Sequence, residues 1–209
     1  MDSGNLKKAA LFHGHVCPGL AIGVRVAELA LKEFFPNRPQ DEEIVAVVEN
    51  DSCAVDAIQL LTGCTLGKGN LILKDYGKQV YTFIKRPEGP KKSKAAGEAI
   101  RISVDLRPPE ESPKEKEMWR RFSEGDRAEE VVKAVNARRS KKIKAIMKAS
   151  DDELFRVNRL NTRPPCRARV VPSVRCEKCG EKTMETKMGL TGGRKLCRPC
   201  FEKETSCRS

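Results

Sequence analysis

Four of the nine cysteines in this 209-residue chain form two Cys-x-x-Cys pairs near its carboxyl end. The pairs are Cys176/Cys179 and Cys197/Cys200, and 17 residues separate them. A Cys-x-x-Cys turn places two thiolates on one side of a tetrahedral ion, so two turns complete a closed Zn²⁺ site. The odd cysteine count argues against a framework made only of disulfides. We therefore predict a zinc-stabilised module over residues 172–209, which is too small to form a core without metal.

The sequence between and after these pairs predicts how the module folds. Thr183–Met188 and the pair Gly192-Gly193 are typical of a β-hairpin, and a helical sequence begins near Phe201. A zinc knuckle, a hairpin and a ligand-bearing helix resemble a treble-clef zinc finger. Four protein ligands leave no open coordination position, so the site is predicted to be structural. Iron is the alternative metal, because rubredoxin-like sites use the same four thiolates.

Positive charge is concentrated in the second half of the chain. The net charge is +12, and the regional excess is +1 in residues 1–106, +7 in 107–171 and +4 in 172–209. A zinc ion with four thiolates contributes −2 and lowers the last value to about +2. Residues 133–148 hold seven basic side chains and no acidic one. A solvated face or a dimer arm is the favoured interpretation of that helix, and nucleic-acid binding is the alternative.

The hydrophobic pattern predicts an α+β fold. Helix, strand, helix and then several strands indicate a mixed or antiparallel sheet packed with helices, followed by the zinc finger. Three domains are expected, namely a core over 1–106, a helical arm or linker region over 107–171 and the finger over 172–209. The predicted helices are 18–35, 54–61, 114–122 and 126–149, and the predicted strands are 44–48, 71–73, 80–84 and 100–106.

The two histidines of the chain, His13 and His15, stand in a His-x-His-x-Cys motif that ends at Cys17. In an extended segment these three side chains alternate onto one face. Cys17 also precedes a predicted helix, whose first N–H groups favour a thiolate. Further groups of this kind fall at the ends of other predicted elements, and they comprise Asp51, Cys53, Asp56 and Cys64. Element ends are where α+β proteins commonly build sites, although Cys53 and Cys64 could instead be small core residues.

These motifs occur in an order that resembles a known family. Phe12-His-Gly-His-Val-Cys-Pro-Gly19 is followed by Asp51-x-Cys53 and by Thr62-Gly-Cys-Thr-Leu-Gly-Lys-Gly-Asn70. Over about residues 10–105 the chain is similar to the FmdE component of formylmethanofuran dehydrogenase and its relatives. The resemblance implies an α+β core that tends to dimerise, with a carboxy-terminal treble-clef finger in some members. It also implies association with the molybdenum or tungsten enzyme that fixes CO₂ onto methanofuran, whose catalytic pterin and cluster motifs this component lacks.

The resemblance further implies a cleft, whose residues would be His13, His15, Cys17, Asp51, Cys53, Asp56, Gln59 and Cys64. We expect His15, Cys17, Cys53 and Cys64 to be the ligands of a second metal ion. Mixed nitrogen and sulfur ligands favour zinc, with iron or nickel as alternatives. His13, Asp51 and Asp56 are expected to do catalytic work, in which the carboxylates orient a ligand histidine or move protons.

The functional expectation is a metal-binding accessory subunit or stand-alone relative of this methanogenesis-related family. A homodimer, oxidoreductase partner subunits and a cytoplasmic location are expected, and independent enzymatic activity is not assumed. No apolar run approaches the roughly 20 residues that a membrane span needs. The alternative is a nucleic-acid-binding or regulatory protein that uses the finger and the basic helix.

Overall fold

The computed structural model describes residues 3–34, 41–87, 95–107, 110–167 and 171–206. The chain divides into two compact units, Met1–Arg167 and Ala168–Ser209, which we describe separately. The sequence predicts boundaries after residues 106 and 171 instead. No helix in the described ranges is both long enough and apolar enough to cross a membrane.

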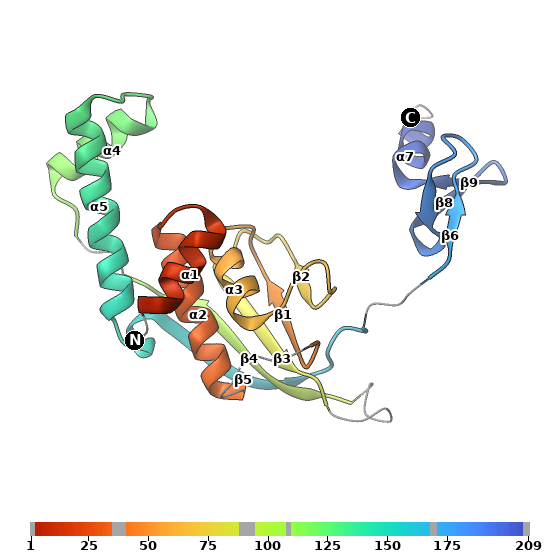
Figure 1. Cartoon of the computed structure of the whole chain (residues 1–209), viewed down its shortest axis with the longest axis horizontal. Helices are drawn as coiled ribbons and strands as arrows, with labels where there is room; N and C mark the ends of the chain where they lie inside the picture. Colours follow the sequence, from red (N-terminus) through yellow and green to blue (C-terminus); the bar gives the residue numbers. More distant parts are fainter. Residues whose placement is uncertain (1–2, 35–40, 88–94, 108–109, 168–170, 207–209) are drawn as a thin grey trace. The chain divides into compact units, whose positions relative to one another are not determined.

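The first unit is built on a mixed five-stranded sheet with the order β2-β1-β3-β4-β5. Its strands are β1 (Ile44–Val48), β2 (Leu71–Leu73), β3 (Val80–Lys85), β4 (Gly97–Val104) and β5 (Phe155–Thr162). β1 and β2 are parallel, and the other neighbouring pairs are antiparallel. Helices α1 (Ser3–His13), α2 (Pro18–Phe34) and α3 (Ala54–Thr62) lie along one face of this sheet (Figure 1). The predicted α+β class is confirmed.

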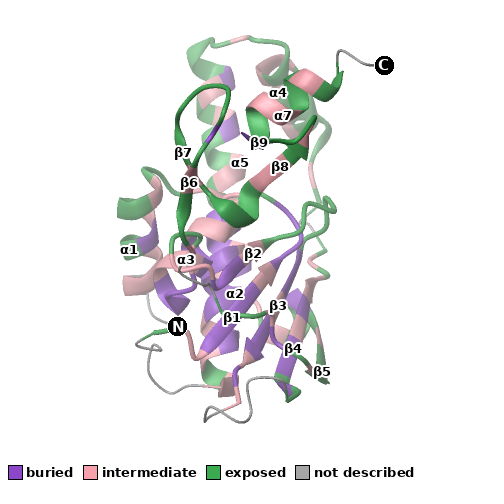
Figure 2. Cartoon of the chain, turned by 90° about the vertical axis from the view of Figure 1, so that its right-hand side faces the viewer, coloured by how far each residue is buried: buried purple, intermediate pink, exposed green. Residues whose placement is uncertain are grey.

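The main core lies between these helices and the sheet. Alternate residues of β1, namely Ile44, Ala46 and Val48, are fully buried in the same cluster as the apolar stripe of α2 (Figure 2). Val45 and Ile84 belong to a smaller cluster on the other face of the sheet. The helix predicted over residues 18–35 is thus confirmed for its described part, and residue 35 lies outside the described ranges.

Helix α1 was not predicted from the sequence. Ala9 is fully buried, whereas Leu11 and Phe12 have exposed fractions of 87% and 57%. The apolar residues of this helix therefore do not follow one continuous stripe, which is the pattern on which helix prediction depends.

Residues beyond 106 form a helical arm and then return to the sheet. The arm consists of α4 (Pro113–Ser123), α5 (Glu129–Lys148) and the short α6 (Asp151–Leu154). The capping box predicted at Ser150 and Glu153 is present. Arg25 of α2, only 3% exposed, donates hydrogen bonds to the carbonyl oxygens of Ile146 and Ala149 at the end of α5. The region predicted as a helical arm or linker also contains β5, which pairs with β4 along its full length.

The second unit is small and metal-finger-like. β6 (Ser173–Arg175) pairs with β7 (Lys182–Met184), β8 (Met188–Thr191) pairs with β9 (Arg194–Cys197), and α7 (Arg198–Ser206) follows. The hairpin turns at Gly192 and Gly193, whose positive φ angles of 55° and 79° favour glycine. The hairpin prediction was wrong over Thr183–Met188, because most of that segment lies in β7 and in a 3₁₀ turn before the hairpin.

Candidate metal centre

Three potential metal ligands lie together at the turn between α1 and α2. His13 is the last residue of α1, Gly14 turns the chain with a positive φ of 93°, and Cys17 directly precedes α2. One donor atom from each of His13, His15 and Cys17 lies within 4.8 Å of the other two. The centroids of the two imidazole rings are 4.5 Å apart. A helix end and a glycine turn, rather than the expected extended segment, therefore bring the three donors together.

Asp56 of α3 holds the imidazole ring of His13. His13 Nδ1 and Asp56 Oδ2 are 2.7 Å apart, and the His13 side chain is 13% exposed. His13 Nε2 is buried and has no hydrogen-bond partner in the described structure. When the carboxylate accepts a hydrogen bond from Nδ1–H, the lone pair of Nε2 is left to bind a metal ion. An unpaired buried nitrogen costs about 1–3 kcal/mol, which coordination would remove. The donor set therefore fits a metal ion.

Cys53 adjoins this cluster from the start of α3. The backbone N–H of Leu20 donates a hydrogen bond of 3.3 Å to Cys17 Sγ. Cys53 occupies the N-cap position of α3, and its thiol is hydrogen-bonded to the thiol of Cys17. Burial and this contact raise the pKa of the Cys53 thiol above its usual value. The structure thus places Cys53 beside the three donors but not among them.

The remaining predicted residues lie elsewhere. Cys64 is fully buried, and its thiol donates to the carbonyl oxygen of Ile44 at 3.6 Å, so it faces β1 and does not join the donor cluster. Gln59 Oε1 accepts a hydrogen bond from the backbone of Leu66 at 3.4 Å, and Asp51 is exposed in the turn before α3. The geometry exchanges two predicted roles, because His13 offers a metal-donor atom and Cys64 does not.

The second unit contains the other donor cluster. The sulfur atoms of Cys176, Cys179, Cys197 and Cys200 all lie within 4.8 Å of one another. The backbone N–H groups of Cys179 and Cys197 lower the pKa of the Cys176 thiol to about 6. Such donors stabilise the thiolate form that zinc requires. Cys179 Sγ and Cys197 Sγ are 3.7 Å apart, a separation that suits two ligands of one tetrahedral ion.

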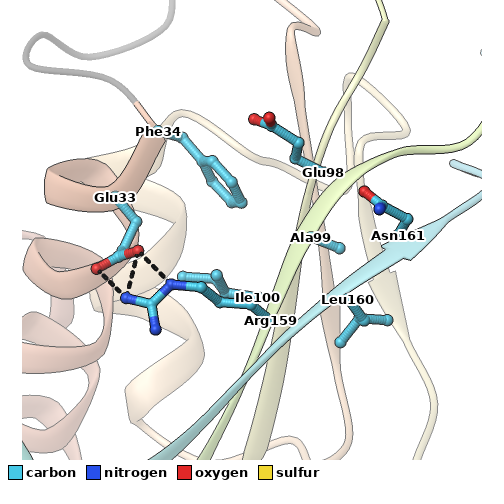
Figure 3. A pocket seen from close by; sticks show the side chains of 8 residues that line it. All are labelled: Glu33, Phe34, Glu98, Ala99, Ile100, Arg159, Leu160 and Asn161. Carbon is cyan, nitrogen blue, oxygen red and sulfur yellow. Dashed lines mark hydrogen bonds and ion pairs between the residues drawn. The ribbon is translucent and has the colours of Figure 1, made fainter.

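A hollow at the opposite end of α2 has different chemistry. Its volume is about 400 Å³, and Figure 3 shows Glu33 and Phe34 on one side and residues of β4 and β5 on the other. Arg159 Nη2 pairs with Glu33 Oε2 at 2.9 Å across it. Since α2 rises 1.5 Å per residue, this hollow lies about 24 Å from Cys17 along the helix axis. None of the residues that line it belongs to the predicted motifs, and it offers neither histidine nor cysteine.

The basic helix α5 is extensively paired with acidic residues. Glu111 binds both Arg138 and Lys142 at 2.7 Å, and Lys141 lies 3.5 Å from Glu115. Three arginines also stack on the aromatic rings of the arm, with Arg138 only 4.4 Å from the ring centroid of Trp119. Much of the positive charge is therefore neutralised within the arm, which weakens the nucleic-acid interpretation.

The fold and donor clusters define an α+β domain with a histidine- and cysteine-containing centre, followed by a four-cysteine finger. The family model described as "FmdE, Molybdenum formylmethanofuran dehydrogenase operon" matches residues 12–156. A second model, described as "Prokaryotic dksA/traR C4-type zinc finger", matches residues 169–205. The chain belongs to the FmdE family and carries a C4-type zinc finger.

Two known proteins are similar to this chain. A curated protein of Archaeoglobus fulgidus, described as a probable S-adenosyl-L-methionine-binding protein, is 30% identical over 200 residues. The match covers 88% of this chain and 50% of that relative, so the chain spans about half the length of the relative. The crystal structure of an FmdE-like protein of the tungsten formylmethanofuran dehydrogenase type, from Syntrophus aciditrophicus, is similar with a TM-score of 0.61. It is 23% identical, with 95% of this chain and 90% of that chain covered, and supports the fold.

Proposed function

We propose that this chain is a metal-binding accessory subunit, or a stand-alone relative, of a formylmethanofuran dehydrogenase-type oxidoreductase. The observation that carries the proposal is the cluster of His13, His15 and Cys17, in which a buried imidazole nitrogen has no partner within the described structure. Association with the dehydrogenase is supported by membership of the FmdE family. A homodimer and a cytoplasmic location belong to the same proposal.

The core centre would hold one ion through three ligands, namely His13 Nε2, one nitrogen of His15 and Cys17 Sγ. Mixed nitrogen and sulfur ligands favour Zn²⁺, with iron or nickel as alternatives. With one position left for water or substrate, such an ion supplies Lewis acidity or an activated water. Asp56 fixes the ring orientation and tautomer of His13. The exposed Asp51 remains a proposed proton-transfer residue.

The zinc of the finger would be structural. Cys176, Cys179, Cys197 and Cys200 complete four-coordination, so no position remains for a reactant. Its small core of Cys176, Leu196 and Cys197 is too limited to hold the module together without the ion.

Elemental analysis of the anaerobically purified full-length chain tests the two sites separately. The wild type should contain two metal ions per chain, His13→Ala should retain the finger ion, and Cys179→Ser should retain the core ion. Cys64→Ala is the matched control, because this cysteine lies outside the donor cluster, and it should retain both ions. A wild type that holds only finger zinc after reconstitution with zinc, iron or nickel would contradict the core site. Because of the printed description of the A. fulgidus relative, S-adenosyl-L-methionine belongs among the ligands titrated against the loaded protein.

A further inference from the structure

We propose that Cys17 and Cys53 form a redox-active thiol pair that reacts with small disulfides, and that closure of the pair releases the core metal. The closure itself depends only on the two thiols. The metal release rests on the proposed function, because Cys17 would also be a ligand of the core ion.

The two thiols meet because α2 and α3 begin side by side. Cys17 directly precedes α2, and Cys53 is the N-cap of α3, so the thiols are 36 positions apart in sequence yet hydrogen-bonded to each other. Figure 1 shows these two helices in contact on the same face of the sheet. Reversible disulfides are formed by such pairs, in which two elements carry their thiols to one place.

Two glycines of α2 permit this approach. A Cβ at Gly23 would lie 2.2 Å from the carbonyl oxygen of Ala54, so the backbones of the two helices touch there. One helical turn earlier, a Cβ at Gly19 would lie 3.3 Å from Cys53 Cβ and 3.8 Å from Cys17 Sγ. Residues four apart share one helix face, so both glycines clear the same side of α2 for the start of α3. Gly19 thereby leaves the space beside the two sulfur atoms open.

Both sulfur atoms are accessible enough to react, which separates them from the third cysteine of the core. Cys17 and Cys53 are half-buried, whereas Cys64 is fully buried. A small disulfide can reach the first two thiols, and Cys64 has no such access.

The reaction is a thiol–disulfide exchange with a compound RSSR. One protein thiolate attacks RSSR, forms a mixed disulfide and releases one RS⁻, which takes up a proton. The second protein thiolate then attacks the protein sulfur of that mixed disulfide and releases the other RS⁻. Two protein thiols are oxidised to one disulfide, and RSSR is reduced to two RSH. A disulfide sulfur carries no charge and is a poor ligand, so the core ion would retain only two imidazoles.

The test treats the full-length chain with oxidised glutathione, alkylates the remaining thiols and maps the cysteines by peptide mass spectrometry. We expect a peptide in which Cys17 is linked to Cys53, its loss on reduction with dithiothreitol, and its absence in Cys53→Ser. Cys64→Ser is the matched control and should form the link as the wild type does. Metal released into a chromogenic chelator is measured in parallel, and one equivalent should leave as the link forms.

Each result has a separate meaning. Recovery of Cys17 and Cys53 as separately alkylated thiols, or a disulfide only among the finger cysteines, would overturn the thiol pair. A Cys17–Cys53 link that forms in a protein without any core metal would leave the pair standing and contradict the proposed metal site. A link that forms while the core ion stays bound would refute the release step.

Discussion

Removal of the Asp56 carboxylate tests the candidate metal centre most directly. In Asp56→Ala, His13 loses the acceptor that lies 2.7 Å from Nδ1, while the three proposed ligands all remain. The ring can then rotate or adopt the other tautomer. Carboxylates that hold a ligand histidine typically contribute 10–100-fold in metal affinity, so we expect a loss of about 1.4–2.7 kcal/mol of binding free energy.

The assay is a competition titration of Zn²⁺ between the protein and a chelator of known affinity, at fixed pH and with the finger already loaded. Asp51→Ala is the matched control, because it removes the same charge from an exposed position in the adjacent turn. It should leave the affinity within about twofold, since screened surface charges contribute little. Equal affinity of Asp56→Ala and wild type, or an equal loss in both variants, would refute the assigned role of Asp56.

Three further substitutions test the fold around the two sites. Gly23→Ala places a Cβ 2.2 Å from Ala54 O, so urea denaturation should show a loss of about 1–3 kcal/mol, whereas Gly67→Ala, which meets nothing within 4 Å, should change little; equal stabilities would contradict the close approach of α2 and α3. Arg25→Met leaves the buried carbonyl of Ile146 without its donor and should lower the free energy of unfolding by about 2–4 kcal/mol, against less than about 0.5 kcal/mol for the exposed Arg156→Met. Cys179→Ser should make residues 171–206 sensitive to limited proteolysis and leave the first unit resistant, and a protease-resistant finger without zinc would show that metal is not required there.

Strong periodicity made part of the fold predictable from the sequence. The stripe of α2 and the short apolar runs of β1 and β3 reflect burial that is visible in the chain itself. β5 has no such pattern, because most of its residues are exposed, and only its pairing with β4 makes it a strand. Its place in the sheet is a consequence of tertiary structure, which a local pattern cannot contain.

The candidate site was predictable in its members but not in their roles. Motif order correctly indicated that His13, His15 and Cys17 belong together, and the structure groups them. Which sulfur joins them depends on the direction of each thiol, and Cys64 points to the carbonyl of Ile44. The partnership of His13 with Asp56 spans 43 positions and arises from the packing of α1 against α3, so spacing alone could not reveal it.

The two donor clusters differ in a way that separates structural from chemical roles. The finger brings four thiols together and completes a coordination sphere, so the proposed ion there has nothing left to exchange. The core offers three donors, one of them a buried nitrogen that lacks any other partner in the described structure, and a fourth group, Cys53, that already contacts a proposed ligand. A site with this composition can gain or lose a ligand without unfolding a domain. The core centre is therefore where exchange of water, substrate or a redox partner would occur, and the surrounding sheet and helices serve to hold its donors in place.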